Sequence, residues 1–453
     1  MKNKEVTIKI SAVSAKGFGV GRFGDYVILV NEGLPQDELL VKIVKAKKHY
    51  GYGKILRIIQ PSPYRIDDNV LCEHSSRCGG CQWLHCNYNA QLDFKKQIVT
   101  DALTKIGGIK NPPVNDTIGM GKPLRYRNKG AFPVVPVSGS TNGFEIGMYE
   151  SRSHRIIPIN DCAIQHPAHV PILAAFRSFM TQAKLTTYDE ITHSGLVRNI
   201  MVRPSFATSD VMVVITINGK RLPDEGGLAK ELAAAGATTV VVRRHTKKGD
   251  VTSDANDYRI ISGSGYIMEC IGDLKYMLAA PSFFQVNPHQ TKTLYDIALA
   301  QAELSGEGIV IDAHCGVGSI ALYIAKYAEQ VIGVDIVRSA IHDAKRNADL
   351  NGIDKSSFIC GYAEIEIPAM LENGIKPKAI FLDPPRKGCD RALLDEIIAA
   401  KIEKVVYISC DPATLARDIN ILAIGGYKLK TVQPVDMFPM TAKVEVVTEL
   451  VLQ

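Results

Sequence analysis

One cysteine, Cys410, stands where a nucleophile could act. It follows the apolar run KVVYIS at 404–409 and precedes Asp411-Pro412 and a run typical of a helix. A thiol at a strand end that faces a helix N-terminus is expected to be biased toward thiolate, its reactive form. A lone cysteine is more often a core residue. However, Asp383–Pro385 ends the strand-like run before it, and parallel strands present such ends together where ligands bind.

A second group of residues is typical of a nucleotide site. The buried run Ile309–Asp312 leads into the glycine-containing segment His314–Ser319 and then into a helix, and the next run ends in Asp335, about 23 residues after Asp312. That carboxylate is placed to accept hydrogen bonds from both ribose hydroxyls, which suits a dinucleotide or S-adenosylmethionine. The third glycine of the dinucleotide fingerprint is missing, which favours S-adenosylmethionine because it carries no phosphate.

A carboxylate followed by two prolines, Asp383–Pro385, is expected to lie at the same sheet edge. Such a turn is also found in methyltransferases that act on exocyclic amines, but these place an aromatic residue after it. Arg386 stands in that position here. The structural alternative is a proline turn with a carboxylate that caps a helix.

A thiolate beside a methyl donor suggests one reaction in particular. Carbon 5 of uracil is a poor nucleophile, and thiolate addition at carbon 6 turns the ring into an enolate whose carbon 5 can attack a sulfonium methyl. A base must then remove the carbon 5 proton so that the thiolate can leave. Glu445, at the start of the last strand-like run, is the candidate base, although a glutamate there could equally be a solvated edge residue.

The elements that must position these groups indicate a multidomain chain. Residues 1–60 contain five short strand-like runs, typical of a small OB-like β-barrel. Residues 61–275 hold a cysteine cluster and strand-like runs with helical connections, which favour a central mixed α+β domain. Residues 276–453 alternate apolar runs with amphipathic ones, the pattern of a doubly wound, Rossmann-like α/β domain.

The basic charge of the chain is concentrated in the barrel. The whole chain has a formal net charge of +6, and residues 1–60 alone carry 11 Lys and Arg against 5 Asp and Glu. Aromatic and basic residues on one face of such a barrel could bind nucleic acid, or could be only a solvated edge that discourages aggregation. The residues that supply this face are Phe18, Phe23, Tyr26, Lys45, Lys47, Lys48, His49, Tyr50 and Tyr52.

Four cysteines could hold a metal. Cys72, Cys78 and Cys81 are clustered, and Cys162 lies far downstream. In a reducing cytosol such clustering favours a metal over disulfides. Four thiolates can bind zinc or an iron–sulfur cluster, and the spacing alone leaves both open.

These motifs together resemble the RNA uracil-5-methyltransferases that act through a cysteine adduct. Phe283–Asn287 is similar to the family's F-F-Q-x-N, Asp383–Gly388 to its D-P-P-R-x-G, and Ser409–Asp418 to its S-C-[DN]-P-x-T-x-A-R-D. The resemblance covers nearly the whole chain, and the last motif is very specific. His314, Ser319 and Lys443 depart from the family pattern, which usually has an aromatic residue, Asn and His at these positions.

The resemblance implies roles for individual residues. Cys410 would be the nucleophile and Glu445 the proton acceptor. The barrel would be a TRAM domain, an RNA-binding module. Cluster-bearing family members carry [4Fe-4S], so iron–sulfur is preferred over zinc, with Cys72, Cys78, Cys81 and Cys162 as the ligands. The S-adenosylmethionine site would be lined by Gln285, His314, Ser319, Asp335 and Asp383.

The expected activity is transferase chemistry on RNA. We expect S-adenosylmethionine-dependent RNA methylation that gives 5-methyluridine in 23S ribosomal RNA, a step of rRNA processing. The alternatives are the uridine of the tRNA T-loop, an RNA-binding ribosome assembly factor whose methylation is incidental, and an iron–sulfur redox enzyme, which would bind flavin or nicotinamide. Nothing in the sequence requires a protein partner.

The composition excludes several classes of protein. At 453 residues, with 46% hydrophobic and 22% charged residues, the chain is an ordinary globular protein of two or three domains. No stretch approaches the ~18 apolar residues of a membrane helix, and the first residues lack a signal-peptide core. We therefore expect a cytoplasmic protein without membrane contact.

Overall fold

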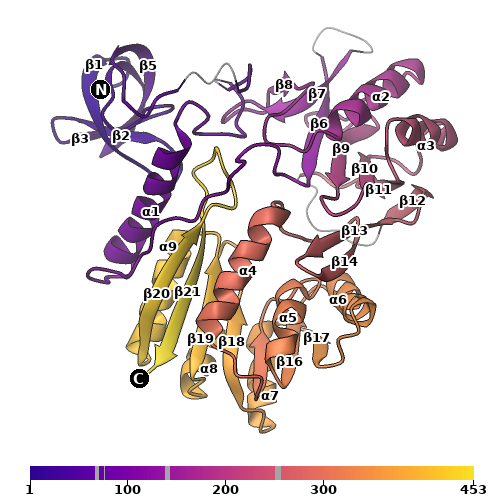
Figure 1. Cartoon of the computed structure of the whole chain (residues 1–453). Coiled ribbons are helices and arrows are strands. Elements are labelled where there is room, and N and C mark those ends of the chain that lie inside the picture. Colours follow the sequence, from indigo (N-terminus) through magenta and orange to yellow (C-terminus); the bar gives the residue numbers. More distant parts are fainter. Residues whose placement is uncertain (67–70, 76, 138–142, 250–256) are drawn as a thin grey trace.

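The computed structural model describes residues 1–66, 71–75, 77–137, 143–249 and 257–453. Within these ranges the strands form a closed five-stranded barrel, a seven-stranded mixed sheet, a two-stranded hairpin and a second seven-stranded sheet. The barrel and the mixed sheet lie side by side above the second sheet (Figure 1). The expected small barrel and the expected doubly wound C-terminal sheet are thus confirmed.

The barrel closes in the strand order β1-β2-β3-β5-β4. Its sequence alternates apolar and polar residues, so Val6, Ile8 and Ile10 of the first strand point inward and are almost fully buried. The barrel strands are β1 Glu5–Val13, β2 Gly19–Phe23, β3 Tyr26–Val30, β4 Glu38–Ala46 and β5 Tyr50–Gln60.

The central sheet is buried on both faces. Alternate residues of its inner strands, such as Val213 and Val214, enter two different cores. One core lies under the helices α2 His169–Gln182 and α3 Glu225–Ala234, and the other is shared with the C-terminal sheet. The strand order is β12-β11-β10-β9-β6-β7-β8. Its strands are β6 Gly130–Pro136, β7 Phe144–Tyr149, β8 Ile156–Pro158, β9 Val197–Pro204, β10 Val211–Ile217, β11 Thr239–Arg244 and β12 Tyr258–Ser262.

The C-terminal sheet is parallel except where β21 enters it. Its order is β17-β16-β15-β18-β19-β21-β20, and β21 is antiparallel to both neighbours. From β15 the chain adds β16 and β17 on one side and β18 and β19 on the other, so the strand order reverses between the parallel strands β15 and β18, the kind of switch point at which such sheets bind ligands. The strands are β15 Ile309–Asp312, β16 Gln330–Asp335, β17 Ser356–Cys360, β18 Pro377–Leu382, β19 Lys404–Ser409, β20 Tyr427–Val435 and β21 Glu445–Leu452.

Helices cover both faces of this sheet. One layer contains α4 Pro288–Ala302, α5 Ser319–Ile324 and α6 Arg338–Leu350, together with the hairpin of β13 Tyr266–Ile271 and β14 Leu274–Ala279. A short 3-10 helix, η1 Ala325–Tyr327, follows α5. The opposite layer contains α7 Ala363–Glu372, α8 Arg391–Ala399 and α9 Pro412–Ile424.

One helix from the N-terminal half of the chain joins the second layer. α1 Tyr88–Lys105 buries Val99 and Leu103 in the same core as α7, α8 and α9, and it packs directly on α9. In Figure 1 it runs from beneath the barrel down the side of the C-terminal sheet. The barrel is thereby connected to the body that carries the expected active site.

Among the described residues, no helix is both long enough and apolar enough to cross a membrane.

Candidate active site

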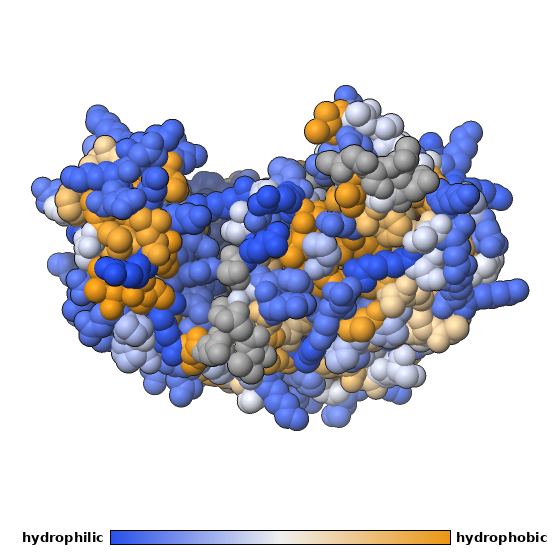
Figure 2. All heavy atoms as spheres, turned by 90° about the horizontal axis from the view of Figure 1, so that it is seen from above, coloured by the Kyte–Doolittle hydropathy of each residue, from blue (hydrophilic) through white to orange (hydrophobic). Residues whose placement is uncertain are grey.

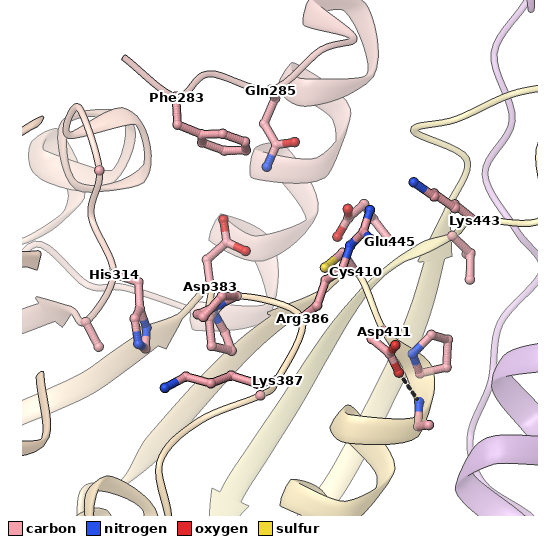
Figure 3. Close-up of a pocket in the computed structure, with 18 of the residues that line it drawn as sticks. Phe283, Gln285, His314, Asp383, Arg386, Lys387, Cys410, Asp411, Lys443 and Glu445 are labelled. Carbon is pink, nitrogen blue, oxygen red and sulfur yellow. Dashed lines mark hydrogen bonds between the residues drawn. The ribbon is translucent and has the colours of Figure 1, made fainter. Parts of the chain in front are cut away.

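The carboxyl ends of the parallel strands open on one large cavity. Its volume is about 1340 Å³, more than the ~300–1000 Å³ of a pocket for one small ligand. The cavity therefore has room for a nucleotide substrate beside a cofactor. The expected cofactor and catalytic residues all line it: Gln285, His314, Ser319, Asp335, Asp383, Cys410 and Glu445. Figure 3 labels five of them, Gln285, His314, Asp383, Cys410 and Glu445.

The glycine-containing loop is held by the carboxylate of Asp335. The backbone N–H of Gly316 donates to one carboxylate oxygen at 3.0 Å, and that of Val337 donates to the other at 2.8 Å. Gly318, which caps α5, has a φ of 80°, in the left-handed region where a side chain would be strained. The remaining lone pairs of Asp335 can accept the hydroxyls of a ribose.

Two buried carboxyl groups mark the cofactor end of the cavity: Asp383 lines it, and Asp312 lies behind the lining, next to Ala313. Burial raises the pKa of Asp383 to about 7, and burial together with Asp383 raises that of Asp312 to about 8. The sequence predicted that Asp312 ends a buried strand, but no role was predicted for its carboxyl group. Its Oδ2 accepts from Ala321 N, while Oδ1 has no partner among the described residues. A cationic ligand would restore the charge of both carboxylates, so this end suits a sulfonium.

The three other expected cofactor residues are fixed to different degrees. Ser319 shares a hydrogen bond with the hydroxyl of Tyr295 at 2.9 Å. The backbone carbonyl of Gln285 accepts from Asn128 at 3.1 Å, which holds the loop before α4. Burial lowers the pKa of His314 to about 4, so its ring is neutral, and its buried Nδ1 has no partner in the described chain. A ligand with a hydrogen-bonding group would satisfy this atom.

Strand register brings the thiol and the candidate base together. β19 and β21 are antiparallel with Ser409 opposite Val446, so Cys410 and Glu445 occupy the next position, one residue beyond the last registered pair. Opposed residues of such a pair lie on the same face of a sheet. Figure 3 shows both side chains directed into the cavity, close to Arg386.

The expectation that Cys410 is biased toward thiolate is wrong for the ligand-free protein. Burial raises the pKa of this thiol to about 11, and the carboxyl groups of Glu445, Asp383 and Asp411 add to the effect. The N-terminus of α9 does not offset it, because Asp411 caps that helix and accepts from the N–H groups of Ala413 and Thr414. The positive end of the helix dipole is thus already paired.

The carboxyl group of Glu445 is buried and unpartnered. Its Oε2 accepts no hydrogen bond within the described residues. Burial and the charge of Asp383 raise its pKa well above the ordinary value, while Lys443 and Arg386 act in the opposite direction. A carboxylate with a raised pKa is a stronger base, and two cations nearby can stabilise negative charge on a bound ring.

The loop that leads into Glu445 is fixed by a buried ion pair. Lys95 of α1 and Asp436 are both fully buried, and Lys95 Nζ donates to the Asp436 carboxylate and to the carbonyl of Phe438. Tyr88 donates to the second carboxylate oxygen at 2.9 Å. Gln91, also on α1, accepts from Met440 N at 3.0 Å. α1 therefore positions the wall of the cavity that ends in Glu445.

The four candidate metal ligands lie in one neighbourhood. The charges of Cys72, Cys78 and Cys162 all raise the pKa of Cys81, in addition to burial. The N–H of Gly80 is directed at the sulfur of Cys78 at 3.4 Å. Such a set fits a metal, because bound metal relieves the repulsion between thiolates. Over the described ranges, no three His, Cys, Asp or Glu side chains already stand at metal-binding distance.

Part of the expected nucleic-acid face of the barrel is in contact with the central domain. The guanidinium of Arg152, between β7 and β8, lies 4.2 Å from the ring centroid of Phe18 and 4.7 Å from that of Tyr52. Tyr26 donates its hydroxyl to the carbonyls of Lys47 and Tyr50. These rings therefore help to dock and close the barrel.

Comparisons with known proteins agree with this geometry. A family described as tRNA (Uracil-5-)-methyltransferase matches residues 209–452, and a family described as the TRAM domain matches residues 1–56. The chain belongs to the RNA uracil-5-methyltransferase family. It is an S-adenosylmethionine-dependent RNA methyltransferase with an N-terminal TRAM domain, as the sequence motifs implied.

Relatives of this methyltransferase align over almost its entire length. An uncharacterized RNA methyltransferase of Halalkalibacterium halodurans is 42% identical over 100% of this chain and 98% of its own length. One of Clostridium tetani is 40% identical over 98% of this chain and 96% of its own. One similar solved structure is the Pyrococcus abyssi tRNA (uracil-54, C5)-methyltransferase in complex with S-adenosyl-L-homocysteine. The two superpose with a TM-score of 0.76 at 24% sequence identity, and the match covers 98% of this chain and 100% of that one. It shares the fold.

Proposed function

We propose that this enzyme methylates carbon 5 of uridine in 23S ribosomal RNA through a covalent bond between Cys410 and carbon 6 of the ring. The observation that carries the proposal is the opposition of Cys410 and Glu445 at the ends of β19 and β21, in a cavity that also holds Asp335 and Asp383. One cavity thus contains a thiol, a candidate base and the residues of a cofactor site. This combination matches uracil methylation through a thiolate adduct more closely than any other reaction.

Each side chain then has a task that follows from its surroundings. Bound S-adenosylmethionine supplies the methyl group as a sulfonium. Asp335 would hold a ribose, and Asp383, which lines the cavity, would stabilise the positive charge, with the buried Asp312 behind it. The Cys410 thiol loses its proton to solvent and its thiolate forms a bond to carbon 6, while the electron pair of the ring double bond moves to the ring oxygen as an enolate near Arg386 and Lys443.

Glu445 completes the cycle as the base. After carbon 5 has accepted the methyl group, it still carries its proton. Glu445 takes that proton, the double bond between carbons 5 and 6 forms again, and the carbon–sulfur bond breaks to release 5-methyluridine and the thiolate. The raised pKa of Glu445 suits a group that must hold a proton inside a closed site.

The substrate is tested by methyl transfer from labelled S-adenosylmethionine to unmodified 23S ribosomal RNA and, separately, to unmodified tRNA, followed by mass spectrometry of the nucleosides. We expect 5-methyluridine in the ribosomal RNA only. A uridine of the tRNA T-loop is the second candidate, supported by the description of the matching family and by the Pyrococcus abyssi relative. Label in tRNA alone would select that candidate.

Two variants test the chemistry. Cys410→Ala should abolish methyl transfer and keep the affinity for S-adenosylmethionine, since the thiol lies outside the ribose end of the cavity. Glu445→Gln should methylate the ring but release it slowly, so a protein–RNA adduct should accumulate on denaturing gels. Absence of an adduct would contradict the role of Glu445. If Cys410→Ala lost cofactor binding as well, its role as a nucleophile would be in doubt.

If neither RNA is labelled while cofactor binding is intact, the assembly-factor alternative gains support. In that case Cys410→Ala should restore ribosome assembly in a deletion strain. Under our proposal Cys410→Ala fails to restore 5-methyluridine in the deletion strain. The proposal also implies that the enzyme acts in the cytoplasm, where its substrate is made.

We also propose that Cys72, Cys78, Cys81 and Cys162 hold a [4Fe-4S] cluster, with zinc as the alternative. Methyl transfer moves no net electrons, so its role would be structural. The segment after Cys81 is tied to the catalytic loop, because the N–H groups of Gln82 and Trp83 donate to the carbonyl of Met440. A cluster here would thus stiffen the wall that ends in Glu445.

The test of the cluster is metal and sulfide analysis of protein purified without oxygen. We expect about four iron and four sulfide per chain, and loss of both in Cys162→Ser. Cys360→Ser is the matched control, since Cys360 is exposed and distant in sequence from the four. Zinc without sulfide would select the alternative.

A further inference from the structure

The turn between β1 and β2 of the barrel reaches the active-site cavity. Val13, Ser14, Ala15 and Lys16 line the same cavity as Cys410 and Glu445. The turn is closed by backbone hydrogen bonds, with Gly17 N donating to Ser14 O and Ser14 N to Phe18 O, both at 2.8 Å. The barrel is therefore a wall of the catalytic enclosure.

The turn is held against the loop that carries the base. Gly17 has a φ of +80°, and a Cβ there would stand 2.8 Å from Cβ of Gln82 and 3.1 Å from Cβ of Ala442. The buried indole of Trp83 donates to the carbonyl of Gly17 at 3.3 Å. Because Ala442 is three residues before Glu445, the turn stands at the substrate end of the cavity.

Lys16 is the one cation of this turn, and its ammonium group is free to bind. Its side chain is exposed and makes no ion pair or hydrogen bond with any described residue. The one acid of α1 that lines the same cavity, Asp101, is paired with Lys105 at 2.7 Å. Lys16 thus adds to the cations Arg386 and Lys443 on the substrate side, whereas the buried carboxyl groups Asp312 and Asp383 lie on the cofactor side.

We infer that Lys16 binds a phosphodiester of the RNA strand next to the uridine that enters the cavity. A base that reaches Cys410 must be turned out of its stack, which costs a few kcal/mol. The phosphate beside such a base is drawn toward the cavity mouth, where an unpaired lysine fits its charge. This inference rests on the proposed function, and it gives the barrel a residue-specific role in substrate placement.

The view from above shows the setting of this site. The barrel and the central domain rise as two lobes with a recess between them (Figure 2). Hydrophilic side chains line much of the recess, and both lobes also show hydrophobic patches beside it. A polar recess suits a nucleic-acid strand, whose backbone is charged along its whole length. Lys16 sits on the barrel side of this approach to the cavity.

The test is the salt dependence of methyl transfer by Lys16→Ala, on an RNA that the unaltered enzyme methylates. We expect KM for RNA to rise about 5- to 10-fold, the effect of one charged contact, with kcat and KM for S-adenosylmethionine unchanged. The slope of log KM against log salt should fall by about 0.7 to 0.9, the share of one phosphate. Lys16→Arg should restore both values.

Lys9→Ala is the matched control, because Lys9 is an exposed lysine of the same barrel that does not line the cavity. It should leave the slope unchanged. An unaltered KM and slope in Lys16→Ala would overturn the inference, and so would a loss of kcat alone, which would mean that the turn acts only on the catalytic loop. Absence of transfer by the unaltered enzyme refutes the proposed function instead, so the two failures are distinguishable.

Discussion

The protonation of Cys410 can be measured directly, and its expected value follows from the site. With a pKa of about 11, only about one thiol in a thousand is ionised at pH 8, compared with roughly a quarter for a free cysteine of pKa ~8.5. Alkylation requires the thiolate. Cys410 of the ligand-free enzyme should therefore react with iodoacetamide about two orders of magnitude more slowly than a cysteine of pKa ~8.5 in an unstructured peptide.

The assay is the alkylation rate of the Cys410 peptide by mass spectrometry from pH 7 to pH 11. The rate should rise about tenfold per pH unit from pH 7 to about pH 10 and less steeply toward pH 11. Glu445→Gln should shift the profile to lower pH, because it removes the negative charge that acts most strongly on this thiol. An inflection at or below about pH 8 in the ligand-free enzyme would refute the reasoning.

A cationic cofactor analogue should change this profile in a defined direction. Sinefungin carries a positive charge where S-adenosylmethionine has its sulfonium, and S-adenosylhomocysteine carries none. A cation near Cys410 favours the thiolate, so sinefungin should lower its pKa by about one to two units, and S-adenosylhomocysteine should not. Equal effects of the two ligands would show that exclusion of water, and not charge, governs the thiol.

Three further predictions concern buried charges. Lys95→Met should destabilise the protein by about 3–5 kcal/mol because Asp436 loses its partner, and Lys95→Met/Asp436→Leu should recover part of this in thermal unfolding. Asp383 binds its proton more tightly in the folded state, with a pKa of about 7, so wild-type stability falls as pH rises from about 4 to 7. Asp383→Asn cannot lose a proton at this position. The free energy of unfolding of the variant relative to wild type should therefore increase by on the order of 4 kcal/mol between pH 4 and pH 8, measured by unfolding at both pH values without cofactor. Asp335→Asn should weaken S-adenosylmethionine binding about tenfold in calorimetry, with RNA binding unchanged.

The site could be read from the sequence where topology alone brings residues together. Asp335, Asp383 and Cys410 follow three apolar runs, and the carboxyl ends of parallel strands meet at one edge. Glu445 was placed at the start of the last strand, but its position beside Cys410 depends on an antiparallel register that no local pattern specifies. The family motifs supplied that link.

The remaining features depend on long-range packing or on competing interactions. Lys16 resembles any other barrel lysine in the sequence, and only the docking of Gly17 on Ala442 brings it to the cavity. The expected thiolate character of Cys410 was wrong because the folded chain buries the thiol beside the carboxyl group of Glu445, and Asp411 already caps the N-terminus of α9. The role of α1 as a support for the catalytic loop was missed because its partner, Asp436, lies 341 residues away in the chain.

The insertion of β21 between β19 and β20 has a consequence for the order of folding. β21 follows both of its neighbours in the chain, and they pair with it and not with each other. β20 and β21 are consecutive strands that can pair as a hairpin, but the pairing of β21 with β19 joins segments separated by α9 and β20, and such non-local pairing forms late. A chain that has not yet taken up β21 already contains Cys410 on its loop but has no Glu445 beside it. The opposition of Cys410 and Glu445 at the cavity is therefore completed only when β21 joins the sheet, so the last step of sheet formation is also the step that assembles this pair.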